Sequence, residues 1–246
     1  MCGRYTLSTP GEVIADLFDL PEAPEVEARY NVAPTQEVAA IRVEEAGAPR
    51  RFVRLRWGLV PHWADDPGIG NRMINARAET AAKKPAFRTS FKRARCAVLA
   101  DGFYEWQKVP GGAKQPWYYR LKSGEPFAFA GLWARWEPKN GDDGGPIESC
   151  TILTTGSNEL VRRVHPRMPV ILEPEDLDLW LDPKLADRER LEAVLDPLEA
   201  SGMIAYPVSR RVNSPATDDP SLLEPQGEAE RAAEGSTAGK QRDLFP

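Results

Sequence analysis

The sequence has few of the residues that build metal sites and disulfide frameworks. Its 246 residues include three cysteines and two histidines. No two cysteines form a Cys-x-x-Cys pair, and His62 and His165 lie far apart in the chain. A small, odd number of cysteines is typical of a reducing compartment and argues against a disulfide-stabilised secreted scaffold. We therefore expect a cytoplasmic protein with no metal and no cofactor.

Long apolar runs are also missing. No run of 18 apolar residues is present, which argues against a membrane-spanning helix, and the first residues lack the apolar segment of a signal peptide. Hydrophobic residues nevertheless make up 41% of the chain and include seven tryptophans, enough for one sizeable core. We expect one monomeric domain over residues 1–220 and a flexible polar tail over 221–246, which is poor in large apolar side chains.

The charge distribution is uneven along the chain. The formal net charge is −5, but residues 42–135 hold 18 Lys and Arg against 8 Asp and Glu. The remaining 14 basic and 29 acidic residues lie on either side of this stretch. A basic central stretch favours a phosphate-bearing partner such as nucleic acid, although a solvated charged surface would give the same count.

Hydrophobic patterning predicts an α+β fold whose core is a predominantly antiparallel sheet or barrel, with helices at the periphery. Alternating runs predict strands, separated by turns rich in glycine and proline, over 2–8, 37–43, 51–60, 94–108, 117–122, 126–136, 148–155 and 203–212. Helices are predicted over 11–18, 157–164, 173–182 and 183–200. Ser8 or Thr9 is the expected N-cap of the first helix, and Ser157 or Asn158 that of the second.

The first four residues read Met-Cys-Gly-Arg. Initiator methionine is commonly removed before a small residue, which would leave Cys2 with a free α-amine beside its thiol. The pKa of an α-amine is about 7.7–8.0, so an appreciable fraction is unprotonated near neutral pH and can form an imine with an aldehyde. The thiol can then close onto the imine carbon to give a thiazolidine. The pattern indicates an aldehyde-capturing residue; the alternative is a small buried cysteine in a first strand.

Three further stretches contain polar residues suited to catalysis or binding. In "MINARAET" an extended backbone would put Asn75 and Arg77 on one face, where an amide beside a guanidinium could position a polar substrate next to a phosphate. In "ADGFYEW" Glu105 lies among aromatic residues and is a candidate general acid or base, or else a surface-facing strand residue. In "VHPRMPV" His165 is a candidate proton shuttle and Arg167 a candidate phosphate contact; a lone histidine is more often structural.

Together, these stretches resemble the SRAP family, the SOS-response-associated peptidases or abasic-site processing proteins. The resemblance covers about residues 1–215 in family order, through "MCGRY", "RYNVAPTQ", "RWGLVPHWADDPGIGNRMINARAET", "RCAVLADGFYEWQK", "AGLWARW", "CTILTTGSNELV" and "HPRMPVIL". The family's active residues fall on Cys2, Asn75, Glu105 and His165. Pro166 departs from the aspartate usual at that position, which leaves only the detail of its loop in doubt.

The resemblance implies a reaction with the ring-opened aldehyde of an abasic site in single-stranded DNA. Cys2 would form a thiazolidine cross-link after Met1 removal and shield the lesion during the DNA damage response. Asn75 would orient the opened sugar, Glu105 would move protons, and His165 would assist ring opening. The imine stage would permit abasic-site lyase cleavage, and we interpret the peptidase activity as self-processing. Such a protein would be associated with the nucleoid.

The resemblance also assigns DNA contacts. Arginines would neutralise phosphates, and apolar or aromatic residues would separate and stack bases. The expected contacts are Arg4, Asn31, Pro34, Trp63, Arg77 and Arg167. The terminal "QRDLF" is similar to peptides that bind the bacterial sliding clamp, with Gln241, Leu244 and Phe245 as its main contacts.

Two other functions remain open. Glutamine-hydrolysing amidotransferases also begin Met-Cys-Gly, with the thiol as nucleophile and the α-amine as base. Arg4 suits a phosphate better than an amide pocket, which disfavours this alternative. The second alternative is a non-covalent reader of single strands or modified bases, in which Cys2 would be dispensable.

Overall fold

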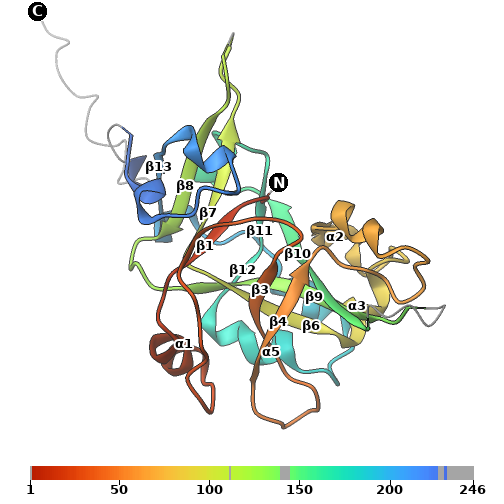
Figure 1. Cartoon of the computed structure of the whole chain (residues 1–246). Coiled ribbons are helices and arrows are strands. Elements are labelled where there is room, and N and C mark those ends of the chain that lie inside the picture. The colour runs from red at the N-terminus through yellow and green to blue at the C-terminus, as the bar shows by residue number, and fades with distance from the viewer. Residues whose placement is uncertain (1, 111, 139–144, 227–229, 232–246) are drawn as a thin grey trace, which may run out of the picture.

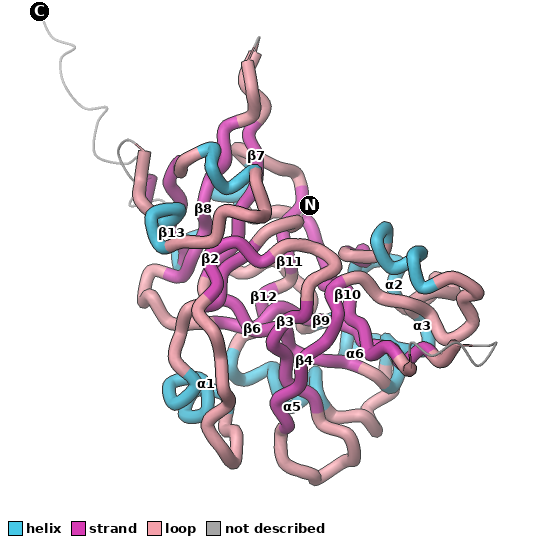
Figure 2. Tube along the Cα trace, in the orientation of Figure 1, coloured by secondary structure: helices cyan, strands magenta, loops and turns pink. Residues whose placement is uncertain are grey.

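The computed structural model describes residues 2–110, 112–138, 145–226 and 230–231. Strands form the body of the protein and short helices lie around it (Figures 1 and 2). Most strand pairs are antiparallel, and one sheet closes on itself. The predicted α+β fold with an antiparallel barrel core is therefore confirmed. Among the described residues, every helix lacks the length and apolar character needed to cross a membrane.

The closed sheet is a barrel that contains most of the long strands. Its pairing runs from β10 to β4, β3, β6 and β9, and β9 pairs with β10 again. The short strands β5, β11 and β12 extend its edges, and β10 runs parallel to β4 and β5. The bounds are β3 Glu37–Arg42, β4 Arg51–Trp57, β5 Asn75–Arg77, β6 Arg95–Ala100, β9 Phe127–Trp136, β10 Ile147–Gly156, β11 Arg167–Pro169 and β12 Ile171–Leu172.

The second sheet has the order β14-β13-β8-β7-β1-β2 and carries the N-terminal strand near its edge. Its strands are β1 Tyr5–Leu7, β2 Arg29–Val32, β7 Gly102–Gln107, β8 Gln115–Leu121, β13 Met203–Pro207 and β14 Glu230–Arg231. Aromatic side chains join the two sheets. The ring of Tyr5 lies 5.4 Å from Trp57 and 5.8 Å from Phe129, and the ring of Phe103 lies 6.2 Å from Phe129. These contacts fix β1 and β7, which hold the N-terminal residues.

Asp101 divides a segment that the sequence predicts as one strand. Residues 94–108 form β6 in the barrel and β7 in the second sheet, with Asp101 at the crossing. Its carboxylate accepts hydrogen bonds from Ser8 Oγ at 2.8 Å and Thr9 Oγ1 at 2.7 Å. The N-cap prediction for the first helix is therefore wrong: both hydroxyls bind Asp101, and Pro10 occupies the N-cap.

The predicted helices lie where the sequence places them, but most are shorter than predicted. The prediction over 11–18 is correct, and Asn158 caps its helix by accepting from Val161 N at 3.0 Å. The predicted helix over 183–200 is shorter. Asp187 is its N-cap and accepts from the backbone N–H groups of Glu189 and Arg190, so the helix begins at Arg188, and Pro197 disfavours helical backbone at the residue before it. The helices are α1 Gly11–Phe18, α2 Ala78–Ala81, α3 Arg88–Arg93, α4 Glu159–Arg162, α5 Leu177–Leu181 and α6 Arg188–Ala193. Turns of 3-10 helix are Pro67–Arg72, Pro174–Asp176, Ala200–Gly202, Arg210–Asn213 and Pro220–Leu223.

The folded chain continues past the predicted domain boundary at residue 220. Leu222 is fully buried with Tyr104 and Val208, and Pro225 bridges to Val208. The segment up to residue 226 therefore packs on the second sheet. Most of the predicted tail, including Gln241, Leu244 and Phe245, lies outside the described residues.

A buried arginine joins α3 and α5 to the barrel. Arg95 is 3% exposed and donates to the carbonyls of Phe91 at 2.8 Å, Trp180 at 2.6 Å and Leu185 at 3.1 Å, and to that of Asp182. Burial lowers its pKa to about 10, so it is still charged at neutral pH. One guanidinium thus satisfies carbonyls at the ends of several elements.

Arg95→Met is expected to destabilise the fold strongly. The substitution leaves several buried carbonyls without a donor, which costs about 3 kcal/mol and lowers Tm by about 6–12 °C for a domain of this size. Thermal unfolding followed by circular dichroism measures the effect. Arg93→Met, at an exposed position of α3, is the control and should change Tm little. A similar Tm for both variants would contradict the role of Arg95.

Candidate functional site

Pairing of β1 with β7 brings the N-terminal residues to Glu105. The N–H of Tyr104 donates to the carbonyl of Arg4 at 3.0 Å, which extends the antiparallel ladder beyond β1. One further step of this register puts Gly3 opposite Glu105. Cys2 therefore lies at the same end of the sheet as the Glu105 carboxylate, which is 2% exposed.

The Cys2 thiol is in an environment that keeps it neutral. Cys2 is fully buried, and its Sγ lies 3.8 Å from the carbonyl oxygen of Arg4. Burial raises the pKa of the thiol well above its usual value, and the nearby negative charge of Glu105 raises it further. A thiol in this state needs a base before it can act as a nucleophile.

Asn75 holds the backbone of Cys2. Its Nδ2 donates to the Cys2 carbonyl at 2.7 Å. The parallel pairing of β5 with β10 positions this amide; Ala76 is buried, Asn75 is half-buried and Arg77 is exposed. The strand therefore puts Asn75 and Arg77 on one side, as predicted. The Oδ1 atom of Asn75 is buried and accepts no hydrogen bond from any described residue, so the site contains an available acceptor.

His165 and Arg167 lie on the other side of β10 from β5. β11 pairs with β10 on one edge and β5 pairs with it on the other. The Nδ1 of His165 lies 2.9 Å from the carbonyl oxygen of Arg167 and 3.1 Å from its backbone nitrogen, so this contact orients the ring. The structure thus joins Cys2, Asn75 and Glu105 through direct contacts and charge, and it joins His165 to Arg167.

The guanidinium of Arg167 binds a carboxylate. Its Nη1 and Nη2 donate to the two oxygens of Glu79 at 2.9 and 3.0 Å, and Nη2 also donates to the carbonyl of Thr154. Arg167 lowers the pKa of Glu79 below its usual range. The sequence analysis missed Glu79, although its position two residues after Arg77 in "NARAET" was a usable signal. A phosphate at Arg167 would compete with this ion pair.

The other predicted DNA contacts differ in accessibility. Trp63 is 43% exposed and Arg77 is exposed, whereas Pro34 is half-buried. Arg4 is half-buried, its Nη1 donates to the carbonyl of Gly3 at 2.8 Å, and burial lowers its pKa. Trp63 and Arg77 are therefore the predicted contacts most open to a ligand.

Asn31 is less accessible than the other predicted DNA contacts. It is fully buried, and its Nδ2 donates to the carbonyls of Val212, Ser214 and Thr217 at 3.2, 2.9 and 2.8 Å. The Nδ2 of Asn31 is therefore engaged within the protein. Its role is to fix the chain around residues 212–217 against β2.

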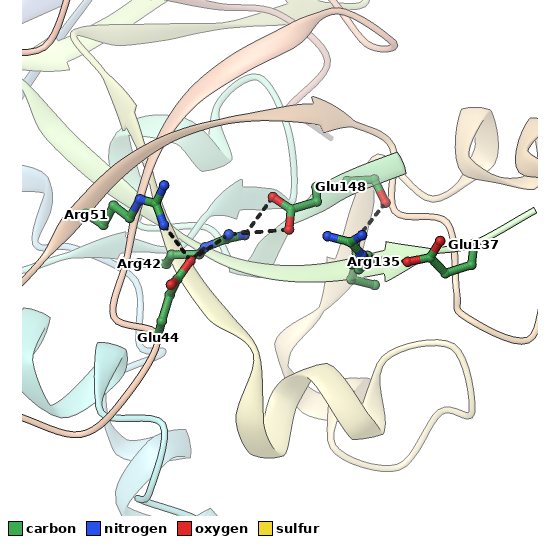
Figure 3. Close-up of polar contacts among 8 residues, drawn as sticks. Arg42, Glu44, Arg51, Arg135, Glu137 and Glu148 are labelled. Atoms are coloured by element: carbon green, nitrogen blue, oxygen red, sulfur yellow. Dashed lines mark hydrogen bonds and ion pairs between the residues drawn. The ribbon is translucent and has the colours of Figure 1, made fainter. Parts of the chain in front are cut away.

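Some cations of the basic central stretch are neutralised internally. Arg42 forms ion pairs with Glu148 at 3.0 Å and Glu44 at 2.9 Å, and Glu44 also binds Arg51 at 3.2 Å (Figure 3). Arg42 also lies 4.1 Å from the ring centroid of Trp133. Glu44 is already counted in the stretch 42–135, whereas Glu148 lies outside it, so the Arg42–Glu148 pair lowers the positive charge available to a phosphate backbone below the counted excess.

Two other observations bear on the chemistry. Across the described ranges, no group of three or more His, Cys, Asp and Glu side chains is arranged to hold a metal ion. Cys96 and Cys150 are free thiols buried in the barrel, and burial raises the pKa of Cys96 to about 12. Buried thiols of this kind are inert, so we interpret Cys96 and Cys150 as core residues.

Known proteins are similar to this chain over most of its length. Abasic site processing protein YoqW of Bacillus subtilis is 46% identical over 228 residues, covering 91% of this chain and 99% of that protein. Abasic site processing protein YedK of Escherichia coli is 31% identical, covering 92% and 100%. A crystal structure of a protein from Bacteroides thetaiotaomicron superposes with a TM-score of 0.80 at 26% identity, covering 92% and 100%.

A family model provides the assignment. The model described as SOS response associated peptidase (SRAP) matches residues 1–215, which include every residue of the site described above. The chain therefore belongs to the SRAP family.

Proposed function

We propose that this protein captures abasic sites in single-stranded DNA through Cys2, after removal of Met1. The observation that carries the proposal is the grouping of a buried neutral Cys2 thiol, the Glu105 carboxylate and the Asn75 amide. The relatives named abasic site processing proteins support the choice of substrate. The protein would act in the DNA damage response as a monomer associated with the nucleoid.

The proposed reaction has two bond-forming steps. The α-amine of Cys2 attacks C1′ of the ring-opened sugar, and loss of water gives an imine. The thiol then adds to the imine carbon: sulfur forms the new C–S bond, the thiol proton leaves to Glu105, and a proton passes to the imine nitrogen. The product is a thiazolidine. The buried position of Cys2 would protect this ring from hydrolysis.

The remaining polar groups have roles that fit their positions. The hydrogen bond from Asn75 to the Cys2 carbonyl fixes the direction in which amine and thiol point, and its Oδ1 can accept a bond from the sugar hydroxyl. His165 would exchange a proton with the sugar oxygen during ring opening. Arg77 and Arg167 would bind phosphates, and Trp63 and Pro34 would contact bases.

Two side reactions follow from the same intermediates. The imine makes the adjacent sugar C–H acidic, so Glu105 could remove that proton and the 3′ phosphate could leave by β-elimination, which is abasic-site lyase chemistry. The peptidase activity in the family name would correspond to self-processing, such as the removal of Met1. Cys2 would thus take part in each of these reactions.

A denaturing gel tests the proposal. Protein with Cys2 verified as its N-terminus by mass spectrometry is mixed with a labelled oligonucleotide that carries one abasic site. We expect a retarded band that survives denaturation, and no such band when methoxyamine has first capped the aldehyde. Absence of the band from the uncapped substrate would overturn the proposal. Release of ammonia from glutamine in its place would instead establish the amidotransferase alternative.

Glu79→Gln is expected to strengthen binding of single-stranded DNA. The carboxylate occupies the guanidinium of Arg167, so its removal frees a cation for phosphate and should raise affinity about fivefold. The dependence of log K on log salt should steepen by about 0.7 for one added phosphate contact. Fluorescence anisotropy over a salt series measures both values.

The control for this prediction is Glu137→Gln, which changes net charge equally and disrupts an exposed pair with Arg135 (Figure 3). It should leave affinity and salt dependence nearly unchanged. Weaker binding by Glu79→Gln would mean that Glu79 orients Arg167 for DNA and does not compete with it.

We also propose that the C-terminal "QRDLF" binds the bacterial sliding clamp. Replacing Leu244 and Phe245 together by alanine removes the two apolar anchors, so binding of full-length protein to immobilised clamp should disappear. Surface plasmon resonance measures this binding, with Thr237→Ala as the control in the same segment. Unchanged binding by the double variant would end the idea.

A further inference from the structure

A second surface, away from Cys2, has the properties of a protein-docking site. We propose that the groove between α1, the start of β9 and residues 171–177 binds a partner peptide that inserts a large apolar side chain and carries Lys or Arg beside it. The inference is independent of the chemistry proposed for Cys2. Figure 1 shows α1 at the lower left, apart from the N-terminus marked N.

Helix α1 leaves part of its apolar surface uncovered. Ile14 and Phe18 pack into the core, whereas Val13 is 42% exposed and Leu17 is 44% exposed. These two residues are four positions apart and therefore neighbours on one helix face. They are two of the four large hydrophobic residues exposed in the described chain. An apolar stripe of this kind on an otherwise polar surface marks a candidate contact region.

Leu17 forms one wall of an adjoining groove of about 390 Å³. This volume lies within the range of sites that accept a small ligand or a few side chains. The lining is mainly apolar and brings together segments that are distant in sequence. Its principal side chains are Leu17, Phe127, Ile171, Leu172, Leu177 and Leu198. The groove therefore offers an apolar floor that continues the exposed stripe of α1.

Carboxylates without basic partners surround this apolar floor. Glu125, Glu173 and Glu175 line the groove, and no Lys or Arg does. Partial burial and the nearby charges of Glu175, Asp176 and Glu199 raise the pKa of Glu173. None of these five carboxylates forms an ion pair with a described residue. The like charges repel one another, and a bound cation would relieve that repulsion.

The apolar floor and the acidic rim together determine which kind of ligand fits the groove. The acidic rim repels the phosphates of DNA, so the groove is not an extension of the nucleic-acid site. An apolar floor inside an acidic rim matches a peptide with Leu, Phe or Met flanked by Lys or Arg. None of the predicted catalytic or DNA-contacting residues lines the groove. A partner could therefore be held while the Cys2 site is occupied.

Phage display with counter-selection tests the proposal. Random 12-residue peptides are selected on the full-length protein and counter-selected on a variant with Leu17→Ser, Glu173→Gln and Glu175→Gln. We expect enrichment of sequences with an apolar residue between basic ones. The best synthetic peptide should bind the wild type and lose at least tenfold in affinity with the variant. Its version with Glu in place of Lys and Arg should not bind.

Two measurements keep the outcome clear. Amide chemical-shift changes on peptide addition should concentrate in 11–18, 125–128 and 171–177, and Val109→Ser, which alters an exposed apolar residue outside the groove lining, should bind like the wild type. Shifts elsewhere, no enrichment, or equal binding by the variant would overturn the proposal. Dimerisation that is lost with Leu17→Ser would also overturn it, because the occupant would then be a second copy of the chain. Binding seen only after truncation at residue 226 would overturn it as well, because the occupant would then be the protein's own tail.

Discussion

Cys2→Ser is expected to abolish the cross-link to abasic DNA that survives denaturation. The variant keeps its α-amine once Met1 has been removed, so an imine can still form. Serine supplies a far weaker nucleophile than the thiol, so the ring does not close and the imine hydrolyses. The same gel with cyanoborohydride present should recover a band, because reduction traps the imine. Loss without reductant and recovery with it would separate the amine from the thiol.

The fold should tolerate this substitution. Cys2 is fully buried, but a hydroxyl at this position can donate to the Arg4 carbonyl that the thiol now approaches at 3.8 Å. We expect a loss of at most about 1–2 kcal/mol, and unchanged non-covalent affinity for single-stranded DNA. Cys150→Ala, which removes another buried thiol, is the matched control and should cross-link normally.

The result distinguishes the proposed function from a non-covalent reader. A reader would give no denaturation-resistant band with either protein, and its affinity would be the same for both. A band of wild-type intensity from Cys2→Ser without reductant would locate the nucleophile elsewhere. Either result would remove Cys2 from the mechanism.

The sequence predicts elements best where local pattern and tertiary packing coincide. α1 has the predicted bounds because its apolar spacing is itself the packing face. Residues 94–108 read as one strand because both halves are apolar and alternate similarly. Their division between two sheets depends on Asp101 binding Ser8 and Thr9, which are more than ninety residues away. Short β2, at Arg29–Val32, was missed because four residues carry little periodicity.

In the candidate site, too, local motifs predict residues, whereas contacts between distant residues appear only in the structure. Motif identity selected Cys2, Asn75 and Glu105, and the structure adds the hydrogen bond from Asn75 to Cys2 and the charge of Glu105 near the thiol. The sequence motifs did not reveal that the Nδ2 of Asn31 is used inside the protein, because its partners lie about 180 residues away. Nor did they reveal Glu79, whose partner Arg167 is brought near by two strand pairings across β10. Local sequence spacing does not show which side chains will contact one another across neighbouring strands of a sheet.

Any residue retained ahead of Cys2 is expected to abolish the cross-link while the thiol stays intact. Acylation converts the α-amine into an amide, whose nitrogen lone pair is delocalised and does not form an imine with an aldehyde. The thiol alone gives only a reversible thiohemiacetal, which does not survive denaturation. Burial also keeps this thiol neutral, so it gains no compensating reactivity.

A fusion protein whose cleavage exposes Cys2 makes the comparison within one preparation. Before cleavage we expect single-stranded DNA binding but no denaturation-resistant complex; after cleavage the complex should form, with the new terminus verified by mass spectrometry. Because the two samples share the same domain and the same thiol, they differ only in the extension and therefore in whether the α-amine of Cys2 is free. Equal cross-linking before cleavage would show that the α-amine is dispensable, and the thiazolidine would have to be abandoned. Loss of DNA binding by the uncleaved protein would instead show that the extension blocks the site, and a single retained Met1 would then decide between blockage and chemistry.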